Sequence, residues 1–281
     1  MQNVKITADS TCDLSGPLLQ KYDISISPLS INMGDKTYHD GVDIHPDDLY
    51  GYAERTGRLP KTAAVTKQEY LRLFTPYVVA GRSVVHFTIS SEMSSCYQNA
   101  VSAAAELENV YVVDSRNLSS AIGLLAIRAS ELAARGADGE EIKKRMDRDR
   151  EKLETSFVIS TLRYLSKGGR CSAVAALGAN LLSLKPCIEV KGGRMTVGKK
   201  YRGKLEKCLE RYGKDRLSGR KDLDLERCFI THSSLPPYVA ARVRNLVRGY
   251  VPFQEILDTD AGCTVCSHCG PGTLGILFFR K

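Results

Sequence analysis

Three cysteines and a histidine stand close together near the carboxyl end of the sequence, in the stretch GCTVCSHCGPGTLGI. Cys263, Cys266 and Cys269 have C-x2-C-x2-C spacing, with His268 among them. A closed zinc or iron–sulfur site needs four protein ligands, and in the bacterial ferredoxin spacing the fourth cysteine would fall at position 273, a threonine here. In an extended stretch, the side chains of His268 and Cys269 would also point to opposite faces. A distant cysteine can still complete the set, so a cysteine-ligated metal or redox protein remains an alternative.

Three glycines of the same stretch, Gly270, Gly272 and Gly275, have the G-x-G-x-x-G spacing of a dinucleotide-binding loop. Such a loop must follow a strand and begin a helix, whereas the ILFFRK that follows Gly275 is typical of a strand. The segment GKKYRGKL (198–205) is a near match to a phosphate loop, but Leu205 stands where a Ser or Thr must reach magnesium. Neither stretch is therefore predicted to bind a nucleotide.

The composition is that of an ordinary globular protein with one large or two modest domains. The chain has 281 residues, of which 43% are hydrophobic and 26% charged. No apolar run approaches the ~20 residues of a transmembrane helix, and MQNVKITADS is typical of a strand rather than of a signal peptide. The nine cysteines do not suggest a disulfide framework, and most are expected to be small buried hydrophobes. We therefore expect a cytoplasmic protein without stable membrane insertion.

The net charge of +8 does not by itself identify a partner. The basic residues are dispersed, and EEIKKRMDRDREKLE mixes both signs as a solvated helix face does. The densest positive stretch is GGRMTVGKKYRGK (192–204), which suits an ordinary basic surface, an acidic protein partner or nucleic acid. Since no nucleic-acid-binding module is recognisable, no nucleic-acid partner is predicted.

Strands and helices alternate up to about residue 155. Strands are predicted in NVKITADS, SVVHFTISS and NVYVVDS, and DISISPLSINM is predicted to be extended. Helices are predicted at about 16–22, at about 94–108, and in HPDDLYGYAERTG, KQEYLRLFTPYVVAG, LSSAIGLLAIRASELAARG and DGEEIKKRMDRDREKLE. This alternation favours an α/β fold with a Rossmann-like, mainly parallel sheet for residues 1–155.

The second half, residues 156–281, has a different pattern. A strand in SFVIST is followed by a predicted apolar helix in GGRCSAVAALGANLLSL. KPCIEVKGGRMTVGKK predicts two strands around a Gly-Gly turn. The strand RCFITHSS, the helix LPPYVAARVRNLVRG and three short extended pieces complete the sequence. We expect an α+β sandwich, whose last strand is able to return to the first domain.

Polar clusters follow several predicted strands of the first half. They are Asp9-Ser10-Thr11, Thr88-Ile89-Ser90-Ser91 and Asp114-Ser115. In open α/β sheets the carboxyl ends of the strands line the ligand crevice, although each such residue is also a common helix cap. Together the clusters favour a crevice rich in neutral hydrogen-bond donors. They contain no clear base–nucleophile pair for an enzyme acting on a small acid, which stays open as a further alternative.

Six segments together resemble the DegV family, the bacterial fatty-acid-binding proteins, in order over residues 4–279. They are VKITADSTCDLS, LPKTAAVT, FTISSEMSSCYQNA, VYVVDSRNLSSAIG, LRYLSKGGRCS and SHCGPGTLGI. The resemblance implies two domains with one long-chain fatty acid, such as a C16 or C18 acid, buried between them and no cofactor besides. It also implies that some members carry the acid for a separate fatty-acid kinase subunit, whose acyl phosphate feeds phospholipid synthesis. A carrier of this kind has no catalytic residues.

The resemblance also implies roles for individual residues. Thr62 and Ser94 would contact the carboxylate of the acid, with Ser90, Ser91 and His268 beside them. A bare carboxylate is costly to bury, and hydroxyls and an imidazole can supply the hydrogen bonds it needs.

Arg170 would lie near the mouth of the site and meet phosphate or the kinase, since its planar fork of donors suits a phosphate. The alternative is an ordinary surface arginine after a Gly-Gly turn. Gly270, Pro271 and Gly272 would form a supporting backbone turn that lets the chain approach the head group.

The sequence departs from the family's pattern at several positions of this site. Ala63 replaces a serine of the head-group loop, so one hydroxyl is missing. Ser95 and Cys96 stand where the family usually has Gly and Thr, and Cys269 replaces a threonine after the histidine. These changes keep small side chains but weaken the hydrogen bonding. We expect lipid binding to persist, and an altered ligand stays an alternative.

Overall fold

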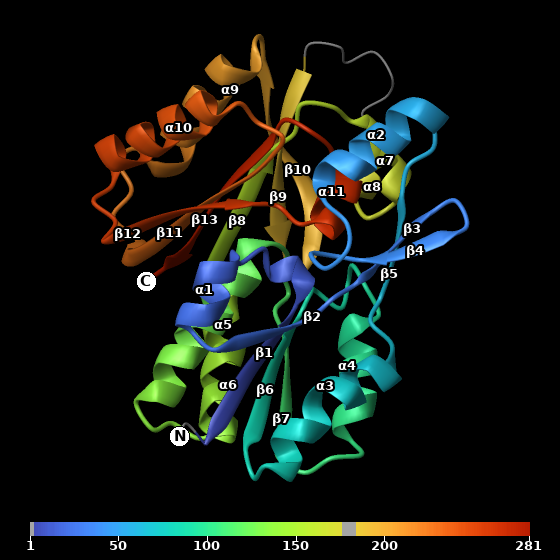
Figure 1. The fold of residues 1–281 in the computed structure, drawn as a ribbon. Coiled ribbons are helices and arrows are strands. Elements are labelled where there is room, and N and C mark those ends of the chain that lie inside the picture. Colours follow the sequence, from blue (N-terminus) through green and yellow to red (C-terminus); the bar gives the residue numbers. More distant parts are fainter. Residues whose placement is uncertain (1–2, 176–183) are drawn as a thin grey trace.

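The structure is a computed structural model that describes residues 3–175 and 184–281, and its strands form three sheets (Figure 1). The first is a four-stranded parallel sheet of order β2-β1-β6-β7. Its strands are β1 (Val4–Asp9), β2 (Ile24–Ser27), β6 (Ser83–Thr88) and β7 (Val110–Asp114). The predicted Rossmann-like parallel sheet is confirmed, because these apolar strands are separated by helical crossovers.

Helices cover both faces of the four-stranded sheet (Figure 1). On one side lie α3 (Lys67–Val79) and α4 (Cys96–Ala104), and on the other α5 (Ser120–Ala134) and α6 (Gly139–Asp149). The short α1 (Gly16–Lys21) connects β1 to β2. Two of these helices begin at capping boxes, in which Thr66 pairs with Glu69 and Asp138 with Glu141. The predicted helices therefore exist, although α4 is shorter than the expected 94–108.

A small antiparallel sheet of order β4-β3-β5 extends from this layer. It consists of β3 (Ser30–Met33), β4 (Lys36–His39) and β5 (Lys61–Ala63). The extended segment DISISPLSINM thus divides between two different sheets, since β2 joins the parallel one and β3 the small one. The helix α2 (Pro46–Thr56) lies between β4 and β5 in the chain.

The third sheet is mixed, with order β10-β9-β8-β13-β11-β12. All its neighbours are antiparallel except β11 and β12. The strands are β8 (Leu153–Val158), β9 (Leu184–Lys191), β10 (Arg194–Arg202), β11 (Leu223–Ser233), β12 (Glu255–Asp260) and β13 (Thr273–Arg280). The predicted Gly-Gly hairpin is present as β9 and β10, which pair antiparallel around Gly192 and Gly193. The domain boundary at 155/156 remains a prediction; β8 begins at Leu153, and the last strand, β13, pairs within this sheet.

Alternating side chains of β13 belong to two apolar clusters on opposite faces of the six-stranded sheet. Leu274, Ile276 and Phe278 join the cluster formed with α9 (Leu205–Leu217) and α10 (Pro237–Tyr250). Leu277 and Phe279 join the larger cluster, which extends from the inner face of this sheet to the core of the parallel sheet. The two-residue period of a strand explains how β13 serves both cores.

Short helices connect the longer elements of the chain. They are α7 (Arg163–Gly168), α8 (Ser172–Ala175), α11 (Cys263–Cys269) and the single turns η1 (Ser10–Cys12) and η2 (Arg150–Lys152). Only the start of the predicted apolar helix in GGRCSAVAALGANLLSL is seen, as α8, and its remainder lies outside the described residues. Within residues 3–175 and 184–281, no helix combines the length and the apolar character needed to cross a membrane.

The cysteine-rich stretch is helical, so the expectation that it is extended was wrong. The backbone N–H groups of Cys263 and Thr264 donate to the Asp40 carboxylate over 2.7 and 3.2 Å. The N–H of Gly262 donates to Asp13 over 2.9 Å. Side-chain carboxyl oxygens at the first turn satisfy otherwise unpaired N–H groups. Both acids come from segments more than two hundred residues away in the chain, which a local pattern does not reveal.

Candidate ligand-binding site

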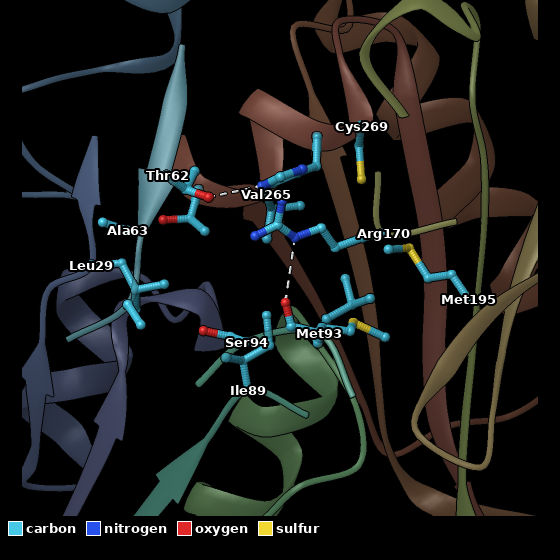
Figure 2. A pocket seen from close by; sticks show the side chains of 14 residues that line it. Leu29, Thr62, Ala63, Ile89, Met93, Ser94, Arg170, Met195, Val265 and Cys269 are labelled. Atoms are coloured by element: carbon cyan, nitrogen blue, oxygen red, sulfur yellow. Dashed lines mark hydrogen bonds between the residues drawn. The ribbon is translucent and has the colours of Figure 1, made fainter. Parts of the chain in front are cut away.

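A cavity lies where the small sheet, the loop between β6 and α4, and the helix α11 meet (Figure 2). It contains about 530 Å³ of space not filled by atoms, including its open mouth. Most of its wall is apolar, with contributions from Leu29, Ile89, Met93, Leu118, Met195 and Val265. The polar part of the wall consists of Thr62, Ser94, Arg170, Thr264 and His268. Four of the residues that the sequence predicts for one site, Thr62, Ser94, His268 and Arg170, therefore line one cavity.

Thr62 and His268 form the polar contact at the centre of this group. The Thr62 Oγ1 atom on β5 lies 2.9 Å from His268 Nε2 on α11. Thr62 is held by the pairing of β5 with β3, where it lies opposite Ile31. The hydrogen bond therefore joins the small sheet to the cysteine-rich helix, over 206 positions of sequence.

The His268 ring is neutral at neutral pH. Burial, and to a lesser extent the positive charge of Arg170, lowers its pKa to about 4. A neutral imidazole has one N–H donor and one acceptor nitrogen. His268 can therefore donate to an anion, and an anion placed beside it would raise its pKa again.

The first glycine of the Gly-Gly-Arg segment makes room for this ring. A Cβ atom on Gly168 would lie 2.5 Å from His268 Nδ1, which is closer than Cβ atoms in real structures come to other side chains. The close approach of α7 to the imidazole thus requires glycine at this position. The following Gly169 has a φ of +69° and ends α7 in the left-handed conformation.

Arg170 lies at the exposed rim of the cavity, and in the view of Figure 2 its guanidinium extends into the space between Thr62 and Ser94. Its N–H groups donate to the carbonyls of Gly168 (2.9 Å) and Met93 (3.4 Å). Within the part of the chain that the structure describes, no carboxylate forms an ion pair with Arg170. The guanidinium is thus free to meet an anionic ligand.

Ser94, at the opposite wall, is half-buried, and its hydroxyl donates to Cys96 Sγ over 3.2 Å. Because sulfur is a weak acceptor, this hydroxyl can turn to a better one. Together with Thr62 and His268 it would surround a carboxylate with neutral donors.

Ser90 and Ser91 do not line this cavity. The Ser90 hydroxyl donates to the carbonyl of Gly193 over 2.7 Å, and the Ser91 hydroxyl donates to Asp114 over 2.6 Å. Both bonds brace the loop that carries Ser94. Asp114, at the end of β7, thus holds the loop between β6 and α4 and does not cap a helix with its side chain.

The acid at the end of β1 is also structural. The Asp9 carboxylate is fully buried and accepts hydrogen bonds from Tyr70 Oη (2.6 Å) and the N–H of Ile89 (3.0 Å). His86 Nε2 lies 3.2 Å away from the same carboxylate. This network fixes Ile89, the first residue of the loop that leads to Ser94, so Asp9 helps to position the site without lining the cavity.

The Gly270-Pro271-Gly272 turn is likewise placed beside the site and is not among the residues that line the cavity. Gly270 has a φ of +77°, and a Cβ there would lie 2.6 Å from the Tyr164 ring. The carbonyl of Pro271 accepts a hydrogen bond from Ser160 Oγ over 2.5 Å. The turn holds the end of α11 against the segment after β8, and its supporting role remains a prediction.

The cysteines do not form a metal site in the described part of the chain, where no group of three or more suitable ligands converges. The thiol of Cys263 donates to the carbonyl of Ile44, and that of Cys266 lies 3.1 Å from Ser233 Oγ. Burial raises the pKa of Cys266 to about 12, so it is a thiol rather than the thiolate that binds metals. Cys269 faces the ligand cavity. The metal or redox alternative therefore finds no support.

Thr264 is a lining residue that the sequence did not suggest. It lies on α11, one helical turn before His268, and its side-chain oxygen is buried. This spacing would have revealed it if the stretch had been taken as a helix. The sequence also did not suggest Asp13, which accepts a hydrogen bond from the N–H of Gly262 at the start of the same helix. Burial raises the pKa of Asp13 to about 8.

A second cavity of about 360 Å³ lies beside the first. The two share Leu118, Val265 and Cys269 in their walls. The second cavity passes between the start of α5 and the inner face of the six-stranded sheet, where Phe157 and Leu277 contribute apolar surface. Polar side chains thus line part of the first cavity, and the second lies deeper, against the six-stranded sheet.

Comparison with known proteins places the whole chain in one group. The model of the family described as "Uncharacterised protein, DegV family COG1307" matches residues 3–281. A DegV domain-containing protein of Clostridium perfringens is 31% identical, with all of both chains covered. The solved structure of a fatty-acid-binding DegV family protein from Thermus thermophilus has a TM-score of 0.89 and 28% identity over all of both chains. A stearic-acid-binding protein from Eubacterium ventriosum has a TM-score of 0.81 and 26% identity, covering 99% of this chain and 98% of that one.

Proposed function

Since this chain belongs to the DegV family, we propose that it binds one long-chain fatty acid across the two neighbouring cavities, with the carboxylate at the mouth of the first. The observation that carries the proposal is the pair of Thr62 and His268, 2.9 Å apart, beside Ser94 and Arg170 in a cavity that is otherwise apolar. The fatty-acid binding of the Thermus thermophilus and Eubacterium ventriosum proteins supports it.

The polar end of the cavity suits a carboxylate. An ionised carboxyl group only accepts hydrogen bonds, and it accepts them through two oxygens. Thr62, Ser94 and the neutral imidazole of His268 offer donors, while the guanidinium of Arg170 offers a positive charge at the rim. These donors and this charge offset the desolvation cost of burying a carboxylate.

The interior suits an alkyl chain. Each buried CH2 group contributes about 0.8 kcal/mol, so a C16 chain contributes roughly 10 kcal/mol before ordering costs. Leu29, Ile89 and Leu118 provide apolar surface in the first cavity, and Phe157 and Leu277 in the second. An acid such as a C16 or C18 acid would therefore be held mainly by its tail and oriented by its head.

We further propose that the protein acts in the cytoplasm as a carrier and presents the acid to a separate kinase. In that reaction a carboxylate oxygen attacks the γ-phosphorus of ATP, and ADP leaves as the acyl phosphate forms. Arg170 lies at the exposed rim and has a fork of donors suited to phosphate. The groups around the cavity bind and orient, so the transfer would depend on catalytic groups of the kinase.

Mass spectrometry of the purified full chain tests the binding proposal. We expect a mass excess of one fatty acid under native conditions and its loss on denaturation. The His268→Ala and Ser94→Ala variants should lose most of this adduct. Ser130→Ala should retain it, because Ser130 lies outside both cavities and donates to the carbonyl of Tyr22. Absence of any acyl adduct, together with failure to take up added stearic acid, would refute the proposal.

The carrier role needs a separate assay. The loaded protein is mixed with a fatty-acid kinase subunit and ATP, and acyl phosphate is trapped with hydroxylamine. We expect product with the wild type and a loss of rate in Arg170→Ala with most of the bound acid retained. Tight binding of the acid without acyl phosphate, with a kinase that phosphorylates the acid on another carrier, would limit the function to binding.

A further inference from the structure

The second cavity contains more polar groups than a channel for a plain hydrocarbon tail requires. Its wall includes Ser119, Thr155, Thr231, His232, Ser233 and Thr273. Three of the strands that form its floor, β8, β11 and β13, each contribute at least one hydroxyl. At the centre of β13, Gly275 lies between Phe157 on β8 and Thr231 on β11, and a Cβ atom there would lie 3.1 Å from Phe157 Cβ and 3.2 Å from Leu277 Cδ1.

Most of these hydroxyls already have partners. Thr231 Oγ1 lies 2.9 Å from Thr259 Oγ1, and the Thr273 hydroxyl donates to the carbonyls of Cys269 and Gly270. Thr155 differs, because its side-chain oxygen has no hydrogen-bond partner within residues 3–175 and 184–281. Thr155 is only 2% exposed and lines the cavity, so its hydroxyl has no access to bulk water.

A buried hydroxyl without a partner is unfavourable, and a saturated alkyl chain beside it would leave it unpaired. An oxygen on the ligand would resolve this. The Thr155 hydroxyl would donate to it, and the ligand's own hydroxyl proton would be accepted by a hydroxyl of the same wall, since each of those oxygens has two acceptor sites.

We propose that the second cavity receives a hydroxylated segment of the acyl chain, so that the preferred ligand is a hydroxylated long-chain fatty acid recognised by Thr155. This inference rests on the proposed function, since it places the carboxylate of the same ligand at Thr62 and His268. It concerns the tail, whereas the head-group residues determine whether any fatty acid binds.

The test is a competition measured by native mass spectrometry on the delipidated full chain. Stearic acid is mixed in equal amounts with each member of a positional series of hydroxystearic acids. When the hydroxyl is at one position, or at two neighbouring positions, along the acyl chain, the wild type should prefer the hydroxylated acid to stearic acid. The expected preference is about fivefold, the effect of one net hydrogen bond. Thr155→Val has the same shape without the hydroxyl and should remove this preference.

Two further variants complete the test. Thr155→Ser restores a hydroxyl and should retain the preference for the hydroxylated acid. Thr196→Val serves as the matched control, because Thr196 is also a strand threonine but lies outside both cavities and donates to the carbonyl of Glu189. It should compete as the wild type does.

The outcomes separate the two proposals. If stearic acid binds at least as well as every hydroxylated isomer in the wild type, the inference is wrong and the proposed function stands. A preference that persists unchanged in Thr155→Val would overturn the role of Thr155. If neither stearic acid nor any isomer binds, the proposed function fails, and this inference fails with it.

Discussion

Lowering the pH should destabilise the empty protein through His268. The pKa of this histidine is about 4 in the folded chain, against an ordinary value of 6.5. The unfolded chain therefore takes up a proton as the pH falls through about 6.5, while the folded chain does so only near pH 4. Stability conferred by the neutral ring is thus present at neutral pH and is lost as the pH decreases across this window.

The size of this loss of stability follows from the shift in the pKa of His268. Each pKa unit corresponds to 1.36 kcal/mol, so the full difference is about 3.4 kcal/mol below pH 4. Between about pH 7 and pH 5 the loss in the free energy of unfolding is about 2 kcal/mol. Asp13 acts in the opposite direction, because burial raises its pKa to about 8 and a protonated form is favoured in the folded state. The contribution of His268 must therefore be obtained as a difference between variants.

The assay is urea unfolding of delipidated protein at several pH values, for the wild type and His268→Gln. We expect the wild type to lose about 2 kcal/mol more than the variant over this pH range. Thr62→Val is the control, because it removes the hydrogen-bond partner at 2.9 Å but keeps the imidazole, so its pH dependence should resemble that of the wild type. Parallel pH profiles for the wild type and His268→Gln would refute the reasoning.

Three further changes test other parts of the site. In Gly168→Ala the new Cβ would lie 2.5 Å from the His268 ring, so fatty-acid affinity should fall at least tenfold, whereas Gly249→Ala, which meets no atom within 4 Å, should bind normally. Asp40→Ala removes the acceptor of two N–H groups at the start of α11 and should cost about 3 kcal/mol in chemical unfolding; a loss below about 0.5 kcal/mol would contradict this role. Tyr70→Phe removes one donor to the buried carboxylate of β1 and should lower the free energy of unfolding by about 1–3 kcal/mol with ligand preference unchanged; a changed preference would show that the network reaches the ligand.

Local patterns in the sequence predicted most of the elements correctly. The apolar strand SVVHFTISS became β6, and the Pro and two acids of HPDDLYGYAERTG begin α2 (Pro46–Thr56) as a helix start should. The Gly-Gly pair predicted the β9–β10 hairpin. These features depend on the period of side chains and on the backbone preferences of a few residues, which the sequence displays directly.

The site was predictable only in part. The resemblance to the family suggested Thr62, Ser94, His268 and Arg170, and these four lie around one cavity. It did not separate them from Ser90 and Ser91, whose hydroxyls bond to Gly193 and Asp114 instead. A strand end carries several hydroxyls in a row, and successive side chains point in different directions.

The sequence by itself determined the alternation of strands and helices, the small residues of the site and the glycines at its close approaches. Only the tertiary structure decided that the cysteine-rich stretch is a helix, because Asp13 and Asp40 reach its first turn from the other end of the chain. The same packing buries the thiol of Cys266 against Ser233 and places Thr155 in the wall of a cavity. Conformation is largely set by near neighbours, whereas burial and hydrogen-bond partners depend on segments that meet only when the chain has folded.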